Sequence, residues 1–158
     1  MKFFLFIIFL FISQNIYSLE LECYFEEVYQ DGSSQQGIFL LKGENLRYQY
    51  FDKELYTIIN NSDGLHLVNN STRLPQPLQV NYEIIDFLIE QSNLFPNNLE
   101  NYSSVNFNAE IIKSKNNIFI KNIIIKKENI NLNIHFFDCK NKTNNSFMFH
   151  HNPMRILK

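Results

Sequence analysis

Apolar and polar residues alternate along much of the chain with a period of two, which is typical of half-buried β-strands. The first alternating segment covers residues 21–29, and one of its faces consists of Leu21, Cys23, Phe25, Glu27 and Tyr29. A turn sequence, Asp-Gly-Ser-Ser, follows at residues 31–34. The pattern therefore predicts a strand that directs a mainly apolar face at a core.

The same criteria predict eight further strands, at residues 38–42, 46–51, 55–60, 65–69, 105–112, 118–126, 130–137 and 147–150. The Asp63-Gly64 pair is the strongest turn signal in the chain and predicts a hairpin between the strands that flank it. Residues 70–79 contain Pro75 and Pro77, and proline interrupts the hydrogen bonding of a strand ladder. We therefore predict a loop at 70–79, and a polar linker at 96–104.

One segment has a helical period instead. Within residues 83–95, apolar residues recur at the spacing of one helix face, at Ile84, Ile85, Leu88 and Ile89. Phe95-Pro96 ends the segment, because a proline cannot continue a helix. The chain therefore contains one predicted helix between two groups of strands.

These elements predict a mainly β (α+β) domain, in which a strongly curved antiparallel sheet, or incomplete β-barrel, has a covering helix on its open side. The chain has 158 residues, 45% of them hydrophobic, which suits a single domain over residues 19–158. Its concave face can close tightly on the helix, or leave a cavity for an acyl chain or another apolar ligand. The periodicity does not separate these two outcomes.

The N-terminus has the three parts of a secretory signal peptide. Met1-Lys2 is a short positive region, residues 3–12 form an unbroken apolar run, and residues 13–18 are mostly polar and end in a small residue. A transmembrane anchor is the alternative, but the run falls well short of the roughly 20 apolar residues that cross a bilayer. We expect cleavage after Ser18 and a soluble mature protein.

Cys23 and Cys139 are the two cysteines of the chain. Export would carry them into an oxidising compartment, where a disulfide could tie the first strand to a strand near the C-terminus. Two separate, buried free thiols are the alternative. Neither cysteine has a histidine at a ligand-like spacing, so we expect no metal site.

The formal net charge is −2, which argues against nucleic acid as the main partner because phosphate binding draws on a surplus of Lys and Arg. The charge is unevenly distributed along the chain. Residues 19–110 hold four basic and fourteen acidic residues, whereas residues 111–158 hold nine basic and two acidic ones. This asymmetry either creates two distinct faces for docking or lets strands from the two halves pair favourably.

Several short motifs follow one another between residues 25 and 67. They are Phe25-Glu26-Glu27, a strand from Gly37 to Lys42-Gly43, Leu46-Arg47-Tyr48-Gln49-Tyr50, and Asp63-Gly64 before Leu65-His66-Leu67. In this order they resemble the periplasmic outer-membrane lipoprotein carriers, the LolA-type chaperones. Residues 84–89 are similar to the lid helix of that family, and residues 118–149 to its closing strands. Because the family's first helix has no counterpart here and Lys42-Gly43 stands in place of its Arg-Pro pair, the resemblance implies a reduced, divergent LolA-like half-barrel.

The resemblance implies a periplasmic, monomeric carrier that holds lipoprotein acyl chains or a similar lipid in an apolar cavity and delivers them toward the outer membrane. Its partners would be an inner-membrane donor protein and an outer-membrane acceptor protein. The candidate cavity residues are Phe39, Leu41, Leu46, Tyr48, Tyr50, Ile84, Leu88, Ile134 and Phe136. Lys42 and Arg47 are the candidates for a latch between barrel and lid.

An enzyme is a less favoured class, because the chain has no Gly-x-Ser-x-Gly elbow, phosphate-binding loop or dinucleotide motif. Its four histidines show no metal-ligand spacing, since His150 and His151 are adjacent and would face opposite sides of a strand. We therefore expect no catalytic residues and no cofactor. The alternative to a carrier is a binding or sensor module on the same fold that docks to an envelope protein.

Overall fold

The computed structural model of the chain describes residues 20–76, 83–94, 100–115, 119–127, 130–141 and 149. The predicted signal peptide and its cleavage site lie outside the described residues. The predicted strand at 147–150 does too, apart from Phe149.

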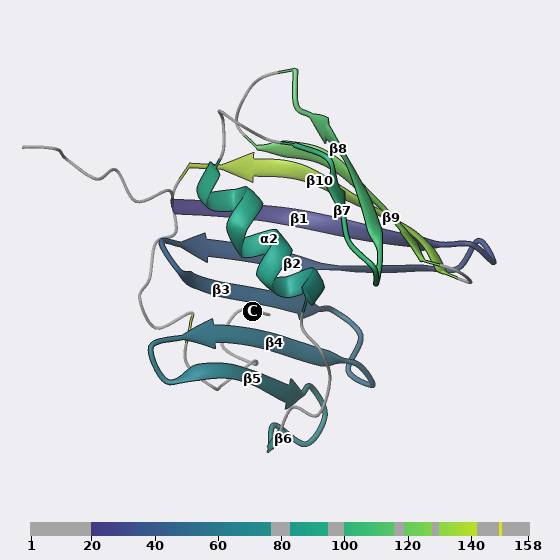
Figure 1. Cartoon of the computed structure of the whole chain (residues 1–158). Coiled ribbons are helices and arrows are strands. Elements are labelled where there is room, and N and C mark those ends of the chain that lie inside the picture. Colours follow the sequence, from purple (N-terminus) through teal and green to yellow (C-terminus); the bar gives the residue numbers. More distant parts are fainter. Residues whose placement is uncertain are drawn as a thin grey trace, which may run out of the picture.

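The described residues form one open antiparallel sheet with a single helix on one side (Figure 1). The strands follow the order β6-β5-β4-β3-β2-β1-β10-β9-β8-β7, so the first strand lies in the middle and pairs with both β2 and β10. This arrangement confirms the prediction of a mainly β, antiparallel domain with a helix. The bounds are β1 (Glu20–Tyr29), β2 (Ser34–Lys42), β3 (Asn45–Tyr50), β4 (Tyr56–Asn61), β5 (Gly64–Asn69), β6 (Pro75–Gln76), α2 (Glu83–Leu94), β7 (Tyr102–Ser103), β8 (Asn108–Lys113), β9 (Ile120–Lys127) and β10 (Ile130–Lys140).

The alternating pattern of β1 corresponds to burial. Leu21, Cys23, Phe25 and Glu27 are buried on the face that carries α2, which we call the inner face. The predicted Asp-Gly turn also forms: Asn61 pairs with Gly64, and Gly64 has a φ of 111°, a conformation that glycine adopts without strain. Period and turn chemistry therefore determine the register of the first half of the sheet.

Two predicted loops contain short strands. Pro75–Gln76 (β6) pairs with β5 at the edge of the sheet, where a proline's missing N–H costs no ladder bond, so the prediction of a loop throughout 70–79 is wrong at these residues. Tyr102–Ser103 (β7) pairs with the start of β8 at the other edge, within the predicted linker. β8 itself begins three residues later than predicted, because Val105 lies fully exposed in a turn.

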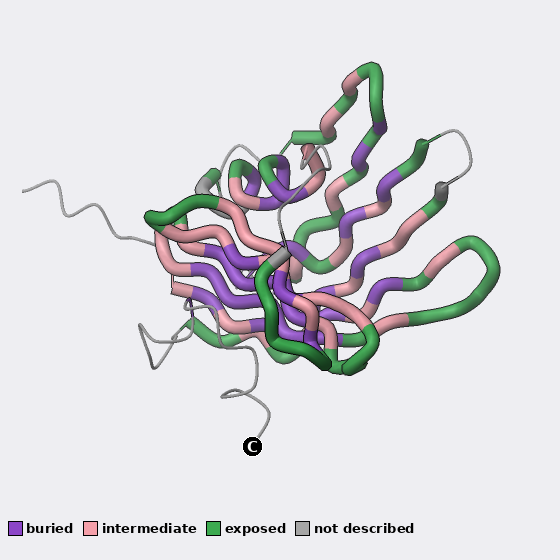
Figure 2. The backbone as a smooth tube through the Cα atoms, turned by 90° about the horizontal axis from the view of Figure 1, so that it is seen from below, coloured by how far each residue is buried: buried purple, intermediate pink, exposed green. Residues whose placement is uncertain are grey.

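The helix α2 lies across the inner face of the sheet and confirms the predicted helix (Figure 1). Its buried residues Ile85, Phe87 and Leu88 belong to the same core as the inward side chains of β1, β2, β3, β9 and β10. Buried residues run along the middle of the curved sheet, while turns and strand ends are exposed (Figure 2). The main core is therefore the space between sheet and helix.

A smaller apolar cluster covers the outer face. Ile38 and Leu40 of β2 pack there with Phe149, whose backbone carbonyl accepts a hydrogen bond from the Asn61 amide at 3.0 Å. The central strands thus have buried residues on both faces, which explains why β2 is a continuous apolar run rather than an alternating one.

Candidate functional site

A pocket of about 240 Å³ lies between the inner face of the sheet and the N-terminal half of α2. We call it the α2 pocket. One end of its lining is polar and aromatic, and the remainder is aliphatic. The lining residues are Glu27, Tyr29, Tyr48, Tyr50, Ile58, Ile84, Ile85, Leu88, Leu132 and Ile134.

The nine candidate cavity residues divide into two groups. Five of them line the α2 pocket, namely Tyr48, Tyr50, Ile84, Leu88 and Ile134. The other four are buried in the adjoining core, namely Phe39, Leu41, Leu46 and Phe136. The sequence left open whether the concave face would pack tightly or leave a cavity. The inner face does both, with a packed core over one part and the α2 pocket over another.

Stacked and edge-on aromatic rings fill the packed part. The Phe39 ring lies 5.5 Å from that of Phe119 and 5.4 Å from that of Phe136, measured between centroids. Such pairs are a favourable way to fill space between a sheet and its cover. These rings pack directly against one another, whereas the α2 pocket beside them leaves space that a ligand can enter.

The polar end of the α2 pocket is a buried carboxylate surrounded by tyrosines. Glu27 is only 4% exposed. Its Oε1 accepts a hydrogen bond from the Tyr48 hydroxyl at 2.6 Å, and its Oε2 accepts one from the Tyr29 hydroxyl at 2.6 Å. The Tyr50 hydroxyl lies 3.0 and 2.9 Å from the two carboxylate oxygens. Three tyrosine hydroxyls therefore satisfy the hydrogen-bonding capacity of the Glu27 carboxylate, which is buried because Glu27 lies on the inner face of β1.

The three tyrosines remain protonated under physiological conditions. Burial is the largest cause that raises the pKa of Tyr29, Tyr48 and Tyr50, and the negative charge of Glu27 raises each of them further. A phenol in this setting keeps its proton and donates it to the carboxylate. The cluster is therefore a fixed set of hydrogen bonds rather than a source of a nucleophilic phenolate.

A second polar cluster ties the N-terminus of α2 to the β7–β8 region. The Glu83 carboxylate accepts hydrogen bonds from the Tyr102 hydroxyl at 3.0 Å and from the Asn106 amide at 2.5 Å. The hydrogen bond from Asn106 is the largest cause that lowers the pKa of Glu83. Sequence reasoning missed this tether, because its members are 19 and 23 residues apart and two of them lie in a predicted linker or strand start.

The two candidate latch residues lie elsewhere. Arg47 lies between Leu46 and Tyr48 on β3, and because those two point inward, Arg47 points to the outer face, away from α2. It is completely buried there, and its Nε donates a hydrogen bond to Gln49 Oε1 at 2.9 Å. Burial lowers the pKa of Arg47 to about 10. Lys42, also on the outer face, forms an ion pair with Glu20 at 2.8 Å. The latch assignment is therefore corrected: the described side-chain hydrogen bonds that tether α2 to the β7–β8 region are made by Glu83.

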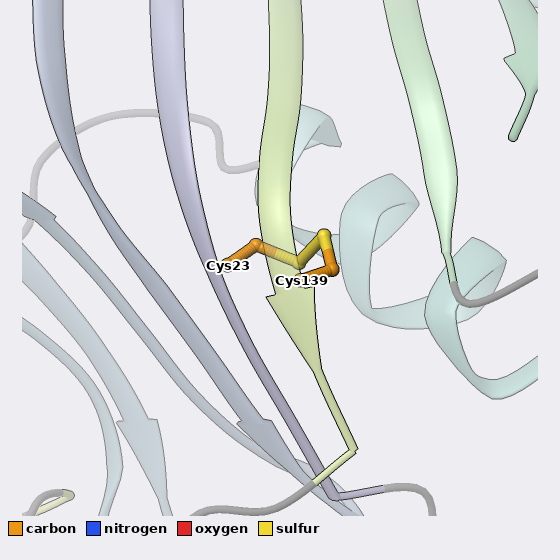
Figure 3. The surroundings of a disulfide bond; sticks show 2 residues. All are labelled: Cys23 and Cys139. Atoms are coloured by element: carbon orange, nitrogen blue, oxygen red, sulfur yellow. A yellow bond between two sulfur atoms is a disulfide. The ribbon is translucent and has the colours of Figure 1, made fainter. Parts of the chain in front are cut away.

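Cys23 and Cys139 form a disulfide between the neighbouring strands β1 and β10, which confirms the predicted pair (Figure 3). A bulge makes the pairing possible. Phe136 points inward, so strict alternation would direct Cys139 outward, but the ladder shifts beyond Phe137 and Asp138 has a φ of 50°. The extra residue returns Cys139 to the inner face, opposite Cys23. A buried disulfide is compatible with an oxidising, extracytoplasmic location.

Within the described segments, no three His, Cys, Asp or Glu side chains come together as metal ligands. The described part of the chain also contains no helix with the length and hydrophobicity needed to span a membrane. Neither the family models nor the curated proteins that were searched match this sequence.

Proposed function

We propose that this protein is an exported binding protein that holds the acyl chain of a lipoprotein or a similar lipid in the α2 pocket and carries it toward the outer membrane. The observation that carries the proposal is the position of this pocket between α2 and an open, curved sheet. The order of the short motifs from Phe25 to Leu67, which resembles the LolA-type carriers, supports the periplasm as the place of action. In this proposal the donor is an inner-membrane protein and the acceptor an outer-membrane one.

The aliphatic lining of the pocket provides the affinity. Ile58, Leu132 and Ile134 from the sheet face Ile84 and Leu88 from the helix. Burying a hydrocarbon chain among them gives about 0.8 kcal/mol per methylene. No bond is made or broken, so delivery requires only an acceptor that covers the chain better than the pocket does.

The helix α2 acts as the lid in this mechanism. Small-molecule pockets usually measure about 300–1,000 Å³, so the α2 pocket, at about 240 Å³, suits a single chain. A larger cargo requires α2 to move away from the sheet. Because Ile84, Ile85 and Leu88 line the pocket from the helix, movement of α2 opens it directly.

The test is native mass spectrometry and lipid extraction of the mature protein isolated from a periplasmic preparation, followed by uptake of a fluorescent decanoyl probe. We expect bound acylated cargo, and probe uptake that is lost in Ile84→Trp, which fills the pocket. Glu90→Trp, which changes an exposed position of the same helix, is the matched control and should bind normally. A ligand-free protein that takes up no alkyl chain would contradict the carrier function.

One observation favours the alternative of a docking module. Partly exposed aromatic side chains form a row on the outer face, in which Tyr24 lies 6.1 Å from Phe51 and 5.9 Å from Phe137, between ring centroids. His135 stacks on Phe137 at 5.8 Å. Such a surface suits contact with a protein partner. Absence of any lipid binding in the experiment above would favour this alternative.

A further inference from the structure

We propose that the ligand of the α2 pocket is an alkyl chain that carries an ammonium group, and that this group binds against Glu27 and the tyrosines around it. The inference rests on the proposed function and specifies the class of lipid. Its two grounds are the charge of the polar end of the pocket and the kind of hydrogen-bonding atoms that this end presents.

The first ground is a buried negative charge without a cation. Glu27 is almost completely buried and lines the pocket. Among the described residues, the ion pair that forms is Lys42 with Glu20 on the outer face, and none involves Glu27. A carboxylate removed from water is costly unless hydrogen bonds and an opposite charge compensate it. The three tyrosines provide the hydrogen bonds, and a ligand cation would provide the charge.

The second ground is that the cluster offers acceptors and no free donor. A phenolic hydroxyl has one hydrogen, and Tyr29, Tyr48 and Tyr50 each direct theirs at Glu27. What remains for a ligand are lone pairs of phenolic and carboxylate oxygens. An ammonium group has three donors and no acceptor, so it fits this end. A fatty-acid carboxylate or a phosphate has only acceptors and a negative charge, so this end disfavours both.

The rest of the pocket suits the alkyl part of such a ligand. Beyond the cluster, the lining residues that the structure describes are aliphatic side chains from β4, β10 and α2, and none of these is charged. The ligand that matches both ends of the pocket is therefore a single alkyl chain with a cationic terminus. Burial of the chain provides affinity, and the contact of the cation with Glu27 provides specificity.

The experiment measures binding of decylamine, decanol and decanoate to the disulfide-bonded mature protein by isothermal titration calorimetry, below their micelle concentrations and at neutral pH. The three probes share a chain and differ in the head group. We expect decylamine to bind about tenfold or more tighter than decanol, because a charged hydrogen bond is added, and decanoate to bind weakest. The preference should disappear in Glu27→Gln, while decanol binding remains.

Glu26→Gln is the matched control. It removes the same charge from the adjacent residue of β1, whose side chain lies on the other face and accepts a hydrogen bond from Gln36 Nε2 at 3.0 Å. This variant should keep the preference for decylamine. If Glu27→Gln does not fold, shown by loss of cooperative melting, the ranking of the three probes on the unmodified protein still decides.

The outcomes separate the two proposals. Equal affinities for the three probes, or tightest binding of decanoate, would overturn the ammonium proposal and leave the carrier function in place. A preference for decylamine that persists in Glu27→Gln would also overturn it. If no probe binds, the carrier function itself fails, and the ammonium proposal fails with it.

Discussion

Reduction of the disulfide should lower the free energy of unfolding by about 5 kcal/mol. Cys23 and Cys139 are separated by 116 residues, so the bond closes most of the folded domain into one loop in the unfolded chain. The chain-entropy relation for a loop of this length gives about 5 kcal/mol at 25 °C. Because a domain of this size typically has only about 5–15 kcal/mol of stability, the reduced protein should be marginal.

The native state itself should change little on reduction. β1 and β10 remain paired through the backbone from Tyr24 with Phe137 to Tyr29 with Leu132, and the two sulfurs need only move apart to van der Waals contact as thiols. The effect therefore acts mainly through the unfolded ensemble, which becomes more expanded. This is why reduction is a better perturbation than truncation to alanine, which would also leave a cavity beside the fully buried Cys23.

The assay is urea unfolding followed by far-ultraviolet circular dichroism, with and without a phosphine reductant. We expect a much lower midpoint and a steeper dependence on urea in the reduced protein, since more surface is exposed on unfolding. Cys23→Ala/Cys139→Ala is the control, and its unfolding should not respond to the reductant. A difference below about 1 kcal/mol would refute the loop-closure reasoning.

Three further predictions concern the sheet and α2. Gly37→Ala should destabilise the protein by about 1–3 kcal/mol in the same urea assay, because its Cβ would clash with the Gln49 carbonyl oxygen and the Phe25 ring. Glu83→Ala should accelerate amide exchange in α2, whereas Asp86→Ala, which removes the other acid of the first turn, should not. Because the pKa of Glu83 is lowered, the carboxylate keeps its tether above its ordinary pKa and loses it as the pH falls through the lowered one. Acid should therefore speed the release of bound decanol, whose neutral head group does not depend on the charge of Glu27, in the unmodified protein but not in Glu83→Ala.

Local chemistry was sufficient to predict the long elements. The inward residues of β1 alternate without interruption, and the Asp63-Gly64 turn fixes its hairpin, so neither depends on contacts far along the chain. Residues 84–89 carry a helical period because α2 has one buried face, and the sequence placed Ile85 and Leu88 on that face correctly. It missed the buried Phe87, while Ile84 and Ile89 are only partly buried. The pair of cysteines could be matched because there were only two.

The remaining features depend on partners distant in sequence. The two-residue strands β6 and β7 exist only through pairing with β5 and β8, and they have no pattern of their own. The bulge at Asp138 brings Cys139 opposite Cys23. Regular alternation in β10 would direct Cys139 to the outer face, so the pattern of β10 alone does not predict the bulge. Arg47 was assigned to a latch although the alternation of β3 already directed it to the outer face.

Glu27 is the clearest case of a site residue that the sequence presents ambiguously. The alternation of β1 places Glu27 on the inward face, but it does not say what role a single carboxylate has there. That role depends on the hydrogen-bond donors around it, which the strand pattern does not identify. One donor, Tyr29, lies on the same strand as Glu27, and the other two, Tyr48 and Tyr50, lie on β3. The two β3 tyrosines were candidates as apolar cavity residues, whereas in the structure their hydroxyls turn one end of the pocket polar.

The Glu83 tether and the polar end of the α2 pocket are connected through a short stretch of α2. Glu83, which holds the helix to Tyr102 and Asn106, directly precedes Ile84 and Ile85, which cover the pocket beside Glu27 and Tyr50. We therefore expect release of Glu83 to loosen Ile84 and Ile85 first, before Phe87 and Leu88 leave the core. In a carrier of this design, the head group of the ligand would enter and leave at the N-terminal end of α2, and the alkyl chain would follow.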